Sequence, residues 1–90
     1  MYSNFVHVLA RGERPETAVP RFRRFSGMDL DYWREHYLLG EADEVAERIN
    51  RSIAAVGGRM DWVVLNPVDW DLEQLDRLAS EVLPHVRHAP

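Results

Sequence analysis

The sequence predicts an α/β fold in which parallel strands alternate with amphipathic helices. Apolar runs at residues 5–9, 36–40 and 61–66 have the composition of strands buried on both faces. Helices with one apolar face are indicated at residues 42–56 and 71–83, after the second and third runs. Such a sheet needs cover on both faces, which two strong helices cannot give. We therefore expect the 90 residues to be part of something larger, or one member of an oligomer.

Residues 1–36 form the first of two expected segments. Residues 5–9 are apolar except for His7, which we interpret as a hydrogen-bonded core histidine, with a catalytic base as the alternative. Residues 11–27 carry five arginines among prolines and glycines, which predicts a long connection with a short helix near residues 19–25. The arginines are expected in a solvated loop or an arm on a partner subunit. Asp29 is the expected N-cap of a short helix at residues 29–37.

Residues 37–90 form the second expected segment, a βαβα unit. Its first helix is expected to pair Glu44 with Arg48 and to end at Gly57 and Gly58. Its second helix begins at Asp71, which has the spacing of a capping box with Gln74. Asp69 and Asp71 are both expected to cap this helix, and Trp33, Trp62 and Trp70 to pack. The expected core positions are Ile49, Ile53, Leu75 and Leu78.

Composition excludes several classes of function. The chain has no cysteine, which excludes disulfides, Cys-ligated zinc, iron–sulfur clusters and a thiol nucleophile. Its net charge of −4 gives no general attraction to nucleic acid or anionic lipid, so neither is an expected partner. The longest uncharged run is ten residues, too short for a membrane span, and no basic region precedes it as in a secretory signal. We expect a cytoplasmic protein with no metal site.

Three stretches of the second segment resemble the C-terminal end of the luciferase-like monooxygenases. Residues 37–49 read Tyr-Leu-Leu-Gly-Glu-Ala-Asp-Glu-Val-Ala-Glu-Arg-Ile, residues 63–67 read Val-Val-Leu-Asn-Pro, and residues 75–87 resemble the closing helix. That family comprises flavin- or deazaflavin-dependent oxidoreductases built on a TIM barrel. The resemblance implies a partial (β/α) barrel fragment with the last two or three βα units, residues 5–9 being strand six. Glu41 and Ala42 depart from the family's usual Thr or Ser followed by Pro.

The resemblance also implies a function. It suggests a C-terminal fragment, subunit or truncated homologue of such an oxidoreductase, inactive alone; the alternative is a non-catalytic, self-associating α/β module. The implied cofactor is FMN or a deazaflavin, with Gly40 and Asn66 as cofactor-binding candidates and no catalytic residue assigned. Self-capping by the acidic residues after Gly40, and a turn before Pro67, are the alternative roles at these two positions. The expected partner is a second copy or the missing barrel portion, and the chain alone should bind flavin weakly.

Overall fold

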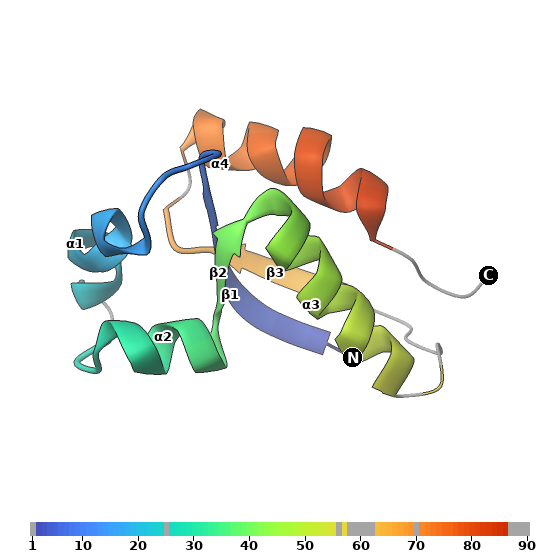
Figure 1. Ribbon diagram of the computed structural model, residues 1–90, viewed down its shortest axis with the longest axis horizontal. Helices are drawn as coiled ribbons and strands as arrows, with labels where there is room; N and C mark the ends of the chain where they lie inside the picture. Colours follow the sequence, from blue (N-terminus) through green and yellow to red (C-terminus); the bar gives the residue numbers. More distant parts are fainter. Residues whose placement is uncertain (1, 25, 56, 58–62, 70, 87–90) are drawn as a thin grey trace.

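The protein is built on a three-stranded parallel sheet. The computed structural model describes residues 2–24, 26–55, 57, 63–69 and 71–86. Strand β1 (Tyr2–Leu9) lies between β2 (Leu38–Glu41) and β3 (Val63–Pro67), which gives the order β2-β1-β3. Both neighbours run parallel to β1. The expected mixed α/β class with parallel strands is therefore confirmed (Figure 1).

The order of the strands differs from the one expected for a barrel fragment. Successive strands are neighbours in a (β/α) barrel, so strands six, seven and eight would lie in the order β1-β2-β3. Here β1 separates β2 from β3, and Val6 is opposite both Leu38 and Pro67. β1 takes the central place because its side chains are buried on both faces at its carboxyl half, from Val6 to Leu9.

One face of the sheet is covered by two helical segments. These are α3 (Ala42–Ala55) and α4 (Leu72–Arg77), which continues as a π-helical turn η2 (Leu78–Val82) and a 3₁₀ turn η3 (Leu83–His85). Their buried side chains form one cluster with the sheet: Val6, Val8, Leu38, Val45, Ala46, Ile49, Ile53, Leu78 and Val82. The core positions predicted at Ile49, Ile53 and Leu78 are confirmed.

The predicted long connection folds over part of the opposite face. It forms η1 (Pro15–Ala18), α1 (Val19–Arg23) and α2 (Leu30–His36), which lie together at the left of Figure 1. Their buried side chains form a second cluster with the sheet: Leu9, Ala18, Phe22, Trp33 and Leu39. The chain thus supplies more cover than the sequence indicated. Among the residues that the structure describes, the amino end of this face is the less covered part, where Phe5 is 41% exposed and Val64 is also exposed.

Several helix ends follow the predicted chemistry. Asp29 accepts a hydrogen bond from the Tyr32 N–H, and Asp71 accepts one from the Gln74 N–H, so both are N-caps. Gly57, with φ of +75°, closes α3 in a conformation that favours glycine. Gly58, Trp62 and Trp70, which also carried predictions, lie outside the described residues.

The predicted pair between Glu44 and Arg48 is wrong. Arg48 instead donates to the carbonyls of Arg34, Glu35 and Tyr37, at 3.0, 3.0 and 2.5 Å. These carbonyls lie at the end of α2, where the last turn of a helix leaves acceptors without intrahelical partners. Arg48 therefore joins α3 to the carboxyl end of α2.

The prediction that Leu75 is a core residue is also wrong. Leu75 is 38% exposed, whereas Gln74 beside it is buried. The helix turns Gln74, Leu78 and Val82 inward, at successive spacings of four residues, and leaves the rest of its apolar arc outside.

Candidate functional site

Gly40 is a packing position in this structure. It lies opposite Val8 on the face covered by α3, and a Cβ at Gly40 would lie 3.2 Å from the Cβ of Glu44. The Glu44 carboxylate accepts the backbone N–H of Glu41 at 3.3 Å, and the Asp43 carboxylate accepts that of Glu44 at 3.1 Å. Backbone N–H groups at the start of α3 thus bond carboxylates of the same segment. The negative charge of these carboxylates repels a phosphate. The residues around Gly40 do not fit the phosphate of a flavin.

Asn66 lies far from Gly40 in the sheet. It is opposite Phe5 on β3, and its Nδ2 donates to the hydroxyl of Ser3 at 3.5 Å. Because side chains alternate along a strand, Asn66 shares the face of Phe5, whereas Gly40 shares the opposite face, that of Val8. The two cofactor-binding candidates are therefore on different edge strands and different faces, and the structure does not bring them together.

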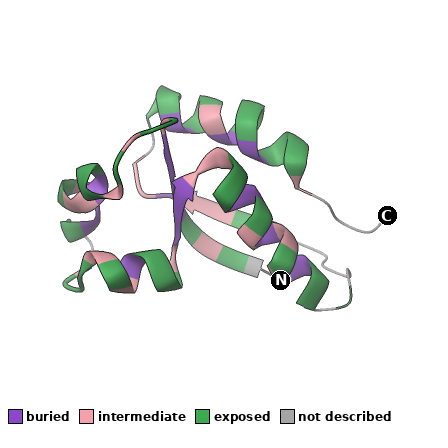
Figure 2. Cartoon of the chain, viewed as in Figure 1, coloured by how far each residue is buried: buried purple, intermediate pink, exposed green. Residues whose placement is uncertain are grey.

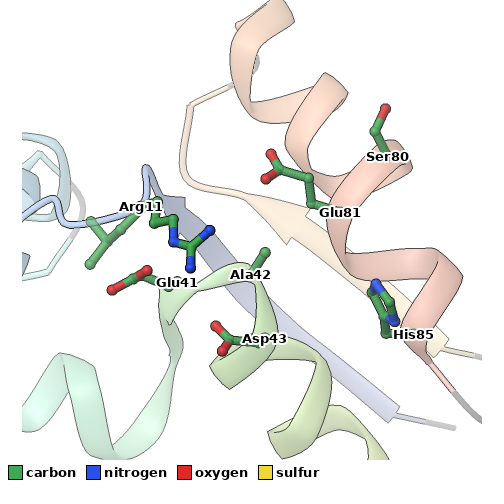
Figure 3. A pocket seen from close by; sticks show the side chains of 8 residues that line it. Arg11, Glu41, Ala42, Asp43, Ser80, Glu81 and His85 are labelled. Carbon is green, nitrogen blue, oxygen red and sulfur yellow. The ribbon is translucent and has the colours of Figure 1, made fainter.

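A cleft of about 460 Å³ opens beside the start of α3. Figure 3 shows the side chains of Arg11, which follows β1, and of Glu81, which lies on η2, extending into this cleft. Its lining residues are Leu9, Arg11, Glu41, Ala42, Asp43, Ser80, Glu81 and His85. The hydroxyl of Ser80 donates to Asp76, so it is not paired with the cleft's histidine. The cleft has an acidic lining but no nucleophile held by a base.

Metal ligation finds no support among the described residues. No group of three or more His, Asp or Glu side chains there lies close enough to hold an ion. Nor is any helix in the described ranges long and apolar enough to span a bilayer.

Ion pairs gather at the carboxyl end of β3. Arg21 of α1 lies 2.6 Å from Asp69 and 3.2 Å from Asp71, and Arg24 lies 3.2 Å from Asp69. Asp69 is therefore an ion-pair partner rather than the second helix cap that we expected. The two arginines are not in a solvated loop, because they fasten α1 to the β3–α4 connection.

His7 lies beneath α1 on the second face of the sheet. Its residue is 2% exposed, and its ring meets that of Phe22 edge to face, with centroids 6.2 Å apart. The Nδ1 atom is buried and has no hydrogen-bond partner among the described residues. Burial lowers the pKa of His7, and the nearby Arg21 guanidinium lowers it further. The expectation that His7 is buried is confirmed, but its expected hydrogen bonding is not seen at Nδ1.

Gln74 and Arg77 close the same end of β1, a role that the sequence did not indicate. The amide of Gln74 bonds Val8 instead of completing the expected capping box with Asp71. Gln74 bonds both backbone groups of Val8, and Arg77 donates to the Val8 carbonyl at 2.9 Å. A glutamine inside an otherwise apolar helix arc was the signal for this role. Both residues serve structure: their polar atoms are used by β1, so neither is free for substrate chemistry.

An apolar stripe runs along the outer side of α4 and its continuation. We call Leu72, Leu75, Ala79 and Leu83 the α4 stripe; Leu72 is 84% exposed and Leu83 51% exposed. Figure 2 shows exposed residues along this side of the helix. The stripe continues the arc that Leu78 and Val82 bury, so the helix is apolar on two adjoining faces but uses one. This exposed apolar stripe is a candidate surface for contact with a partner.

Comparison with protein-family models, curated proteins and solved structures gives no match to this chain. The candidate sites are therefore judged by their geometry. Among the described residues, the best-formed feature that calls for a partner is the α4 stripe.

Proposed function

We propose that this chain is a structural part of a flavin- or deazaflavin-dependent oxidoreductase of the luciferase-like type, and that it acts by association rather than by chemistry. The enzyme class comes from the resemblance of residues 37–49, 63–67 and 75–87. The association rests on the α4 stripe, whose leucines gain free energy when another surface removes them from water. This stripe is the observation that carries the proposal.

The order of elements in the second half of the chain supports the enzyme class. β2, α3, β3 and α4 follow one another as the resemblance requires, with Asn66 and Pro67 closing β3. The strand order does not support it, because β1 lies between β2 and β3. The proposal therefore limits the likeness to the β2–α3–β3–α4 unit.

The cofactor in this proposal is FMN or a deazaflavin that is held only when other parts of the enzyme contribute. Gly40 and Asn66 lie on opposite edge strands, so they do not form a common site within one chain. The carboxylates of Asp43 and Glu44 add charge repulsion at the start of α3. We expect the chain alone to bind neither cofactor tightly and to turn over no substrate.

The strand order favours a second candidate, a non-catalytic module that associates with its own copy. The α4 stripe is suited to a symmetric, antiparallel contact, in which each copy presents the same surface. In that arrangement Leu72 faces Leu83 of the second copy. Leu75 faces Ala79, so that in this second pair a large side chain meets a small one. No flavin is needed in this candidate.

Size-exclusion chromatography with light scattering, run with and without FMN or a deazaflavin, separates the two candidates. A dimer that forms without cofactor and leaves flavin fluorescence unchanged supports the self-associating module. If the chain is instead a structural part of an oxidoreductase, flavin binding should appear only when it is co-expressed with an upstream reading frame that encodes the earlier βα units. Tight flavin binding by the chain alone contradicts both candidates.

A further inference from the structure

His7 lies at the contact between the sheet and α1, and no substrate chemistry in the proposed function uses it. Phe22 of α1 covers its ring, and Trp33 of α2 stacks on Phe22 with ring centroids 5.2 Å apart. The imidazole is therefore shut off from water by this layer, and its Nδ1 has no partner among the described residues. Buried polar atoms in proteins ordinarily have a hydrogen-bond partner, so this atom calls for an explanation.

In the described part of the chain, five charged groups interact with the ring. Glu13 follows β1, Arg21 lies on α1, Asp69 and Asp71 lie between β3 and α4, and Arg77 lies on α4. Two are cations that repel a protonated imidazole. The three carboxylates already have other partners, as the hydrogen bonds and ion pairs around them show.

Each of the three carboxylates is already engaged by another partner. Glu13 accepts hydrogen bonds from the Ala10 N–H at 2.8 Å and from the Thr17 hydroxyl at 2.5 Å. Asp69 holds Arg21 and Arg24, and Asp71 accepts the Gln74 N–H and lies 3.2 Å from Arg21. A proton on the ring would thus create a buried cation without a bonded acceptor, a state that proteins avoid by rearranging or by staying neutral.

We propose that His7 is a proton-sensitive latch, whose protonation releases η1 and α1 from the sheet while α3 and α4 stay in place. Once the covering helix moves, water reaches the charged ring and removes the penalty of burial. The same movement uncovers the apolar surface of Phe22, Trp33 and Leu39, which belongs to the second core cluster. The device links a fall in pH to exposure of an apolar face.

The structure favours local release over global unfolding. α1 has five residues, and it is held by the buried Phe22 and by ion pairs of Arg21 and Arg24, whose side chains are 38% and 67% exposed. Exposed ion pairs are worth little. α3 and η2 share a separate cluster on the opposite face, which the latch does not touch. Segments with few buried contacts open at lower free energy than the core.

Hydrogen exchange measured by mass spectrometry tests the latch. After correction for intrinsic rates, residues 15–24 should exchange several-fold, at most about tenfold, faster near pH 5.5 than near pH 7.5, because a released ring with the ordinary histidine pKa takes up its proton in this range. Residues 42–55 of α3, which open only together with the rest of the core, should exchange far more slowly than residues 15–24 at both pH values. His7→Phe, which keeps an aromatic ring but cannot be protonated, should remove the pH dependence. His85→Gln, at an exposed histidine, should retain it.

Three results would overturn the proposal. One is equal corrected exchange of residues 15–24 at the two pH values. Another is exchange of residues 15–24 at the same rate as α3, which would mean that the two open together in global unfolding. The third is persistence of the pH dependence in His7→Phe. Should that variant fail to fold, His7→Leu replaces it. NMR titration of the wild-type ring gives a second test, because the latch requires the ring to titrate together with the amides of α1. Ring and amide titrations that are separated by more than about one pH unit would also contradict the latch.

Discussion

Gln74 bonds both the N–H and the carbonyl of the Val8 backbone, beyond the point where β3 ends. Its Oε1 accepts the Val8 N–H at 2.8 Å, and its Nε2 donates to the Val8 carbonyl at 2.7 Å. β3 ends at Pro67, opposite Val6, so the paired register stops before Val8. A side-chain amide carries one donor and one acceptor, like a peptide group, and here it takes the place of the next strand residue.

Gln74→Leu should destabilise the protein. The leucine keeps the volume but leaves the Val8 N–H buried without a partner, which costs about 1–3 kcal/mol. The Val8 carbonyl keeps its bond from Arg77. Urea unfolding followed by circular dichroism measures the loss, with exposed Glu81→Gln on the same helical segment as the control. Equal stability of Gln74→Leu and the wild type would show that this amide is not needed.

Leu78→Ala and Leu75→Ala should differ in their effects. Leu78 is buried in the first core cluster, so its truncation should cost about 2–5 kcal/mol. Leu75 is 38% exposed, and the same truncation should cost the monomer about 1 kcal/mol or less. Denaturant midpoints at a protein concentration below the onset of association give the comparison. A larger loss of stability for Leu75→Ala than for Leu78→Ala would mean that the other side of α4 packs against the sheet.

Arg48→Met should be more harmful than Arg51→Met, although the two arginines lie one turn apart on α3. Met keeps much of the apolar stem but removes the donors that bind the end of α2. We expect a loss of about 1–3 kcal/mol for Arg48→Met. Arg51 forms an exposed pair with Glu47, so its replacement should stay within about 0.5 kcal/mol. Thermal unfolding of both variants checks the difference, and similar melting temperatures would refute it.

Stability should fall as the pH drops below about 6.5, the ordinary pKa of histidine. Burial lowers the pKa of His7 in the folded chain, so the unfolded chain takes up the proton first and gains free energy. A second loss should follow below about 4.5. There the bond from Thr17 lowers the pKa of Glu13, and the bond from the Gln74 N–H lowers that of Asp71. In urea unfolding across this range, His7→Phe should remove the first loss and keep the second.

The local elements could be predicted because each depends on a short pattern. The apolar spacing of Val45, Ile49 and Ile53 predicts α3, and Asp29 and Asp71 lie where N-caps are expected. A short helix was expected near residues 19–25, where α1 forms, and Asp29 indicated α2, whereas η1 was not expected among the prolines. These signals lie within a few residues of the structure that they specify.

The strand order and the helix face could not be read in the same way. Apolar strands carry no local signal of which strand they pair with, so the central place of β1 comes only from packing. α4 has an apolar arc wider than the sheet can cover, and the side turned inward is chosen by the bonds of Gln74 to Val8. The two expected cofactor-binding residues, Gly40 and Asn66, lie apart for the same reason. They would be close only if β2 and β3 were neighbours, and β1 lies between these strands.

Association through the α4 stripe is the central claim of this account, and sedimentation equilibrium of the wild type beside Leu72→Asp tests it most directly. Leu72 is 84% exposed, so a charge there should leave the folded monomer intact while it disrupts any apolar contact. The account predicts that the wild type forms dimers or larger assemblies at micromolar concentration, and that Leu72→Asp sediments as a folded monomer. A wild type that stays monomeric with a cooperative thermal transition, or a variant that assembles like the wild type, would contradict it.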